Sequence, residues 1–140
     1  LEAYEKRQEE DERERRRRVC FKDSNMDSWN FANDDRRNEK LSSAMERYAD
    51  NFAIFKKEGR GLLLYGSVGT GKTYYACAVA NELIDKGYSC LCSSLRDIVN
   101  DLQGMWDGKN EYIEALNKYP LIVLDDLVTE RDTDFMKEQI

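Results

Sequence analysis

The sequence contains no histidine, only one proline and no long apolar run. Without histidine, Ser-His-Asp triads, histidine general bases and histidine-ligated metals are all excluded. The single proline and the lack of a Gly/Ser-rich bias argue against a fibrous protein or a linker. The apolar runs are a handful of residues long, far short of the ~20 residues that cross a bilayer. We therefore expect no membrane partner, no membrane span and no signal peptide.

The charge of the chain excludes a further class of protein. Its 140 residues are enough for one domain, and 36% of them are charged, against about 25% in an average domain. Asp and Glu outnumber Lys and Arg by 28 to 22, which gives a net charge of -6. A chain of this balance is not a general basic binder of nucleic acid.

The four cysteines lack the spacing of a metal or redox motif. None forms a C-x-x-C pair, and no histidine is present to complete a zinc finger. Buried free thiols in a reducing cytoplasm are the simplest interpretation, and we expect a cytoplasmic protein. The residues concerned are Cys20, Cys77, Cys90 and Cys92.

The character of the sequence changes twice along the chain. Residues 1–18 are almost all charged, with acid–base pairs four apart, and predict a solvated helical lead-in or a frayed tail. Its basic end, residues 13–18, has phosphate binding as an alternative role. Residues 19–38 show no period and read as an irregular linker whose aromatics pack on the next domain. Residues 39–140 hold that domain. Because the first residue is Leu1, we expect the sequence to begin inside a longer gene product.

Strand and helix patterns alternate through the third segment. Helices are predicted at 38–57, 72–86, 111–118 and after Ser94, where Asp97 completes a capping box; short buried strands are predicted at 61–65, 88–92 and 121–124. This order is typical of an α/β, doubly wound fold with a parallel sheet.

A glycine-rich turn between the first strand and its helix carries the clearest chemical signal. It matches G-x-x-x-x-G-K-[ST] with Gly66, Ser67, Val68, Gly69, Thr70, Gly71, Lys72 and Thr73. The turn directs backbone N–H groups at phosphates, and the helix that follows adds its positive N-terminal dipole. Lys72 would reach the β- and γ-phosphates, and Thr73 would offer its hydroxyl to Mg²⁺. A glycine-rich turn with an unrelated lysine is the alternative.

The third strand ends in acids, which is the Walker B form. Four apolar residues, 121–124, precede Asp125 and Asp126. Ligands of open α/β sheets bind at the carboxyl ends of the strands, where Asp125 would help to hold Mg²⁺. Asp126 would orient the attacking water. Together the two motifs predict a site for ATP or ADP with Mg²⁺; a solvated turn at the strand end is the alternative for the acids.

Residues 21–140 resemble the AAA+ helicase-loader group of DnaC and DnaI, to which the IstB transposition helpers are related. The matching segments are 48–52, 61–73 and 124–130, the last being similar to L-D-D-[IL]-G-x-E except that Val128 replaces glycine. The resemblance implies a P-loop NTPase of the AAA+ (ASCE) type, with a three-layer α/β/α fold. It also implies an adenine pocket lined by Tyr48 and Phe52, ATP-dependent assembly of like subunits on single-stranded DNA, and a replicative helicase as partner.

The resemblance also implies that the fold is C-terminally incomplete. In this group a later strand lies between the P-loop strand and the Walker B strand, and the sequence ends at Ile140 before reaching it. Two sheet edges would then lie open, so we expect a chain ending there to be unstable or to aggregate.

Hydrolysis is expected to be slow. Many AAA+ enzymes have Glu where this chain has Asp126, whose carboxylate is set back by about 1.5 Å, the length of a carbon–carbon bond. Glu130 is the alternative catalytic acid. We expect ATPase activity in the full-length oligomer, with an arginine supplied by a neighbouring subunit, and little or none in the isolated chain.

Other interpretations stay open. An IstB-type transposition helper would use the same motifs with a transposase, and a nucleotide-gated assembly module would bind ATP with little hydrolysis. A small-molecule kinase is less favoured, because a second acid beside Asp125 suits water activation. Four aromatics could stack on bases, although the protein core is their more usual place: Trp29, Phe31, Trp106 and Tyr112.

Overall fold

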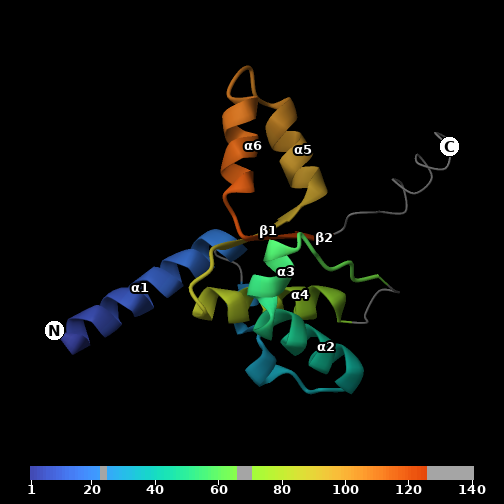
Figure 1. Cartoon of the computed structure of the whole chain (residues 1–140). Coiled ribbons are helices and arrows are strands. Elements are labelled where there is room, and N and C mark those ends of the chain that lie inside the picture. Colours follow the sequence, from blue (N-terminus) through green and yellow to red (C-terminus); the bar gives the residue numbers. More distant parts are fainter. Residues whose placement is uncertain (23–24, 66–70, 126–140) are drawn as a thin grey trace.

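The computed structural model describes residues 1–22, 25–65 and 71–125. Its elements are, in chain order, α1 (Glu2–Phe21), η1 (Asn25–Ser28), η2 (Phe31–Asn33), α2 (Glu39–Asp50), α3 (Phe52–Lys57), α4 (Lys72–Asp85), β1 (Cys90–Ser94), α5 (Leu95–Gln103), α6 (Lys109–Asn117) and β2 (Leu121–Asp125). Figure 1 shows α4 near the middle of the molecule, with α1 extending to one side and α5 and α6 projecting as a pair.

The two strands form a parallel pair. Cys90 is level with Leu121 and Ser94 with Asp125, so both strands end at the same edge of the sheet. The connection between them runs through α5 and α6, as a parallel crossover requires. The predicted α/β fold with a parallel sheet is confirmed.

Strand β1 corresponds to the strand predicted at 88–92 and begins two residues later, at Cys90, because α4 closes with a Schellman motif. The Tyr88 N–H donates to the Leu83 carbonyl at 2.9 Å, and the Gly87 N–H donates to Ile84 at 3.0 Å. Gly87 adopts a φ of 100°, which a residue with a Cβ would rarely adopt. Tyr88 therefore completes the helix end and cannot start the strand.

The predicted strand at 61–65 is not formed. In the described part of the chain no other segment pairs with it, and Leu63 and Tyr65 are 69% and 86% exposed. A strand needs a hydrogen-bonded neighbour. Among the described residues β2 pairs with β1, and residues 61–65 pair with neither strand.

The predicted helix at 38–57 is interrupted at Asn51. At Asn51 the backbone N–H and the side-chain amide both donate to the Arg47 carbonyl, at 3.1 and 2.9 Å, and this shared acceptor closes α2 before α3 begins. The helix begins as expected, because the Asn38 side chain accepts the Leu41 N–H at 3.1 Å.

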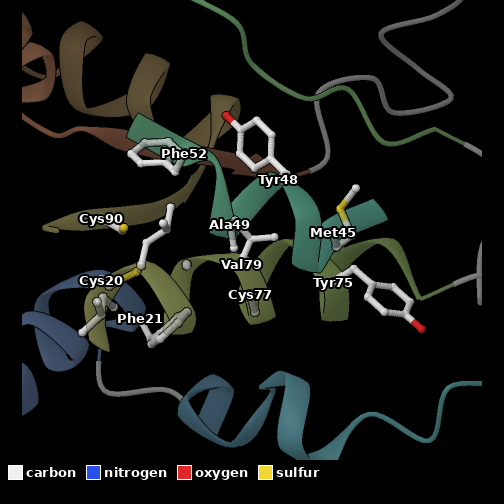
Figure 2. Packing of buried hydrophobic residues seen from close by; sticks show 13 residues of the cluster. Cys20, Phe21, Met45, Tyr48, Ala49, Phe52, Tyr75, Cys77, Val79 and Cys90 are labelled. Carbon is white, nitrogen blue, oxygen red and sulfur yellow. The ribbon is translucent and has the colours of Figure 1, made fainter. Parts of the chain in front are cut away.

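The core surrounds α4. Its buried side chains contact the last turn of α1 and one face of α2 (Figure 2). The largest fully buried apolar residues are Leu83 and Ile84, and they are joined by Cys20, Phe21, Met45, Tyr48, Ala49 and Phe52. Helix α1 therefore continues past residue 18 and docks its end at Phe21, while residues 1–11 are exposed and Arg17 is half-buried against α4.

The cysteines are free thiols in or beside this core, as predicted. Three are buried and Cys92 is half-buried, with its Sγ 3.6 Å from that of Cys20. Burial raises the pKa of Cys90 to about 12. A thiol held in this state is a packing residue and a poor nucleophile.

The aromatics divide into two groups. Trp29 and Phe31 pack against the core, as predicted. Trp106 is fully exposed between α5 and α6, so the prediction of a place in the core is wrong for this residue. Tyr112 lies half-buried and donates to Asp101 of α5 at 2.8 Å.

Within the described ranges, no helix is both long and apolar enough to cross a membrane.

Candidate functional site

Helix α4 begins at the last residues of the glycine-rich motif. Lys72 is its first residue, and Gly71 precedes it with a φ of 85°. A Cβ on Gly71 would lie 3.4 Å from Cε2 of Tyr75, an ordinary contact distance, so the backbone conformation and not the space favours glycine here. Lys72 and Thr73 therefore stand in the first turn of a 14-residue helix, where the helix dipole attracts anions.

The two predicted motifs meet at one point. The Thr73 hydroxyl lies 3.3 Å from each carboxylate oxygen of Asp125. Asp125 is the last residue of β2, level with the end of β1. The structure thus brings Thr73 and Asp125 together at the carboxyl edge of the sheet.

A cavity of about 580 Å³ opens beside this contact. Lys72, Thr73 and Asp125 are its polar end, and aliphatic side chains of residues 61–65 and β2 form most of the remaining wall. It is further lined by Met45, Tyr48, Ala76 and Val79. Residues 61–65 and 121–125 both line the cavity, and the resemblance implies a further strand between these two segments.

Of the two residues expected at an adenine pocket, one lines the cavity. Tyr48 is in the wall, 5% exposed, with its hydroxyl donating to the Arg60 carbonyl at 3.2 Å. Burial raises the pKa of this hydroxyl. Phe52 does not line the cavity; its ring meets that of Tyr48 edge-on at 5.9 Å and supports it from behind.

Several predicted site residues lie outside the described residues. They are Gly66, Ser67, Val68, Gly69 and Thr70 of the glycine-rich motif, and the acids Asp126 and Glu130.

The residues present fit a magnesium ion. Mg²⁺ prefers oxygen ligands in an octahedron, in which neighbouring ligands are about 3 Å apart. The Thr73 hydroxyl and the Asp125 carboxylate have this spacing. Phosphate oxygens and water would supply further ligands. Among the described residues no cluster of three His, Cys, Asp or Glu side chains is suited to a metal.

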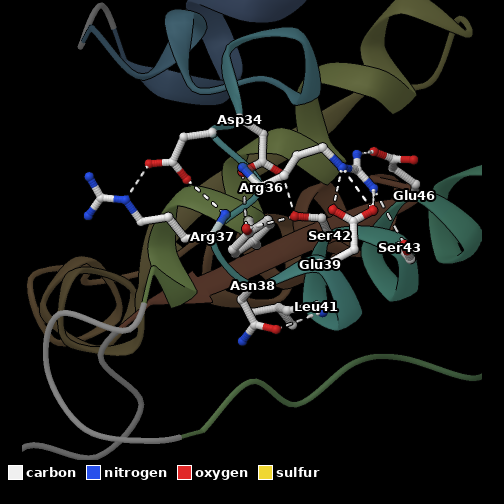
Figure 3. Close-up of polar contacts among 11 residues, drawn as sticks. Asp34, Arg36, Arg37, Asn38, Glu39, Leu41, Ser42, Ser43 and Glu46 are labelled. Carbon is white, nitrogen blue, oxygen red and sulfur yellow. Dashed lines mark hydrogen bonds and ion pairs between the residues drawn. The ribbon is translucent and has the colours of Figure 1, made fainter.

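Sequence reasoning missed the contacts that fasten the start of α4 to the segment before α2. Tyr74 donates to the Asn30 carbonyl at 2.7 Å, and Tyr75 donates to Asp34 at 3.1 Å (Figure 3 shows the surroundings of Asp34). Forty or more residues separate these partners. The irregular segment carries no periodicity that could have indicated them.

Comparison with known proteins decides the family. A model of the family described as IstB-like ATP binding protein matches residues 6–134. The chain belongs to this family. As an IstB-like chain, it has the P-loop ATPase fold that the two motifs predicted.

This IstB-like chain is also similar to curated proteins of bacteria. The replicative helicase loader DnaI of Bacillus subtilis is 32% identical over 85 residues, which cover 59% of this chain and 27% of DnaI. The replicative helicase loader DnaC of Buchnera aphidicola (from Acyrthosiphon pisum) is 25% identical over 125 residues, 86% of this chain and 49% of DnaC. The DnaC of Escherichia coli is 24% identical over 102 residues, 70% of this chain and 39% of that protein. The matches thus span about a quarter to a half of these relatives. No solved structure matches the chain.

Proposed function

We propose that this chain is the ATP-binding module of an AAA+ helicase loader and binds ATP or ADP with Mg²⁺. The observation that carries the proposal is the contact of Thr73 with Asp125 beside Lys72, at one end of the cavity. It joins a cation, a hydroxyl and a carboxylate at a helix N-terminus, which is the set a magnesium–phosphate group requires.

Each residue has a separate role in this proposal. Lys72 would neutralise the β- and γ-phosphates, while Thr73 and Asp125 would hold Mg²⁺, which supplies charge neutralisation at the phosphates. Gly66–Thr70 would cradle the phosphates with backbone N–H groups. Tyr48 would flank the adenine with Phe52 behind it.

Hydrolysis would depend on assembly. Asp126, or Glu130 in its place, would orient the attacking water. Because misplacement on the order of 1 Å can cost ~100-fold in rate, the short side chain of Asp126 favours slow turnover. An arginine from a neighbouring subunit would accelerate it, since such a group is worth ~10³–10⁵.

The names of the relatives support a proposal for the biological role. All three relatives reported above are named replicative helicase loaders, so the proposed partner is a replicative helicase, and the proposed assembly is a homo-oligomer on single-stranded DNA formed with ATP in the cytoplasm. In this arrangement residues 39–140 carry the nucleotide site, residues 1–18 form the charged lead-in and residues 19–38 join them. A transposition helper is the second candidate, because the matching family is IstB-like.

Titration calorimetry with ADP and Mg²⁺ tests nucleotide binding. Lys72→Ala should remove most of the affinity, because the charge that compensates the phosphates is lost. Lys86→Ala is the matched control: Lys86 follows the same helix at its other end, where it contacts Asp50 at 3.2 Å. Equal affinity of wild type and Lys72→Ala would refute the site.

The role of the second acid needs a rate measurement. In the full-length protein, Asp126→Asn should abolish ATP hydrolysis and leave ATP affinity unchanged. Hydrolysis by the 140-residue chain that is brisk and independent of protein concentration would contradict the proposed dependence on assembly. Capture of a purified replicative helicase, compared with a transposase, distinguishes the loader from the transposition helper.

A further inference from the structure

The first turn of α4 is held from outside the site by a closed set of three side chains. Ser42 of α2 is fully buried, and its hydroxyl donates to Oδ2 of Asp34 at 2.5 Å. The Tyr75 hydroxyl lies 2.8 Å from the Ser42 oxygen and 3.1 Å from Oδ1 of Asp34. The Ser42 hydroxyl donates its proton to Asp34, so in the contact between the two hydroxyls Tyr75 is the donor and Ser42 the acceptor. The Tyr75 proton is thus directed at both Ser42 and Asp34, and both hydroxyls have hydrogen-bond partners.

Asp34 is itself fixed by the backbone. The Arg36 N–H donates to its Oδ1 at 2.9 Å, and Figure 3 shows Asp34 beside Ser42 and the start of α2. The Arg36 guanidinium in turn reaches Glu39 at 2.6 Å and pairs with Glu46, both on α2. The acceptor of Tyr75 is therefore anchored to a helix, so it can hold the tyrosine in a defined place.

Tyr75 passes this constraint to the nucleotide end of α4. Its ring stands 3.4 Å from the place a Gly71 Cβ would occupy, and its N–H donates to the Gly71 carbonyl at 3.0 Å. Gly71 directly precedes Lys72 and Thr73. Tyr75 is the fourth residue of α4, so fixing its side chain fixes the first turn of the helix, from which Lys72 and Thr73 project.

We infer that Tyr75, held by Asp34 and Ser42, is a positioning residue that sets the place of Lys72 and Thr73 for the phosphates of the nucleotide. The inference rests on the proposed function. The tyrosine does not line the cavity, and it acts through the backbone at Gly71. Without its hydroxyl bonds, the first turn of α4 would be held less firmly against α2, with the Tyr74–Asn30 bond still in place, and the Thr73–Asp125 geometry would be disturbed.

The other end of α4 provides a contrast within the same helix. There Nε of Arg17 donates to Oδ1 of Asn81 at 3.1 Å, and its guanidinium pairs with Asp85. Asp85 stands thirteen residues after Lys72, about 20 Å along the helix axis. Damage at this end should loosen the docking of α1 and leave the nucleotide site in place.

The experiment compares Tyr75→Phe and Asp34→Asn with Asp85→Asn in the full-length protein. The dissociation constant for ADP with Mg²⁺ and the Tm are measured for each variant. We expect Tyr75→Phe and Asp34→Asn to bind about tenfold more weakly at temperatures well below their Tm, the effect of losing one hydrogen bond to a charged group. Asp85→Asn should lower the Tm and keep the wild-type affinity.

The outcomes separate the inference from the function on which it rests. Wild-type affinity in Tyr75→Phe, or an equal loss in Asp85→Asn, would overturn the positioning role. No binding by the wild type would refute the proposed function instead. If Tyr75→Phe does not fold, Asp34→Asn decides, because Asp34 is only half-buried and Asn has nearly its shape.

Discussion

The Thr73 hydroxyl lies 3.3 Å from both carboxylate oxygens of Asp125, although 52 residues separate the two in the chain. The contact joins the first turn of α4 to the last residue of β2. A group bound there is exposed at once to the positive end of a helix dipole and to a carboxylate. A metal cation that carries anionic ligands suits both, since it pairs with the acid while its ligands face the helix.

Asp125→Asn should remove the magnesium-dependent part of nucleotide binding. An amide supplies a neutral oxygen in place of a charged one, and Mg²⁺ binds it less well. ADP affinity measured with Mg²⁺ should fall about tenfold, whereas affinity measured with a chelator should stay as in the wild type.

The control for Asp125 is Asp101→Asn, which changes an acid of α5 that accepts from Tyr112. It should keep the wild-type response to Mg²⁺. If both variants respond to magnesium like the wild type, Asp125 does not hold the ion.

A double-mutant cycle on Arg17 and Asp85 should show that α1 is docked by this pair. The Arg17 side chain is 24% exposed and also donates to Asn81, so its contact is better ordered than a surface ion pair. We expect a coupling free energy of about 1 kcal/mol from urea unfolding of Arg17→Gln, Asp85→Asn and the double variant.

Arg15 and Glu12 provide the comparison within α1. They lie 2.5 Å apart but are 65% and 40% exposed, so their coupling should be close to zero. A coupling for Arg17 and Asp85 no larger than this one would show that the pair does not dock the helix.

Asp34 should make the protein sensitive to acid. Burial raises the pKa of Asp34, but hydrogen bonds from Ser42, the Arg36 N–H and Tyr75 outweigh this effect, so the net pKa is below its ordinary value. The stabilisation is therefore complete above the ordinary pKa of about 3.9 and is lost as the pH falls through the lower pKa of the folded state. At neutral pH, Asp34→Asn should be less stable than the wild type by ~1 kcal/mol, and the two should converge in acid.

Thermal unfolding followed from about pH 7 to about pH 2.5 tests this dependence. Asp35→Asn is the control, because it changes the neighbouring acid and removes none of the bonds to Asp34. A difference between wild type and Asp34→Asn that stays constant over this range would contradict the assignment.

The unpaired segment 61–65 should cause self-association of the 140-residue chain. Leu62 and Leu63 are 47% and 69% exposed, and among the described residues β2 is paired on one edge alone. Apolar side chains beside an open strand edge favour pairing with another copy. Light scattering should report a mass that rises with protein concentration, and Leu63→Lys should reduce the rise.

Val19→Lys is a matched change, since Val19 is 46% exposed but lies on α1. It should leave the association unchanged. A chain of 140 residues that stays monodisperse and melts cooperatively would show that the open edge has no such effect.

Local signals predicted much of the fold. The Ser94 hydroxyl accepts the Asp97 N–H at 3.0 Å, as the capping box indicated, and Gly87 ends α4 as expected. These features depend on residues a few positions apart, so the sequence displays them directly. For the same reason the glycine-rich motif placed Lys72 and Thr73 at a helix start.

Long-range contacts were the part that the sequence could not supply. Tyr75 meets Ser42 33 residues away, and Arg17 meets Asp85 68 residues away. Such pairs have no spacing rule, and their energies appear only once the fold has brought the helices together. The same holds for residues 61–65, since whether an apolar run becomes a strand depends on the neighbour available to it.

The placement of the two tryptophans gives the molecule two optical reporters of different character. Trp29 is packed with its ring 6.0 Å from that of Tyr74, the residue that follows Thr73, whereas Trp106 stands in open water. A soluble quencher should therefore quench the fluorescence of Trp106 first and leave the fluorescence of Trp29. The remaining fluorescence comes from beside the first turn of α4. A change in its emission wavelength or intensity on adding nucleotide would therefore report a structural change at this turn without any attached dye.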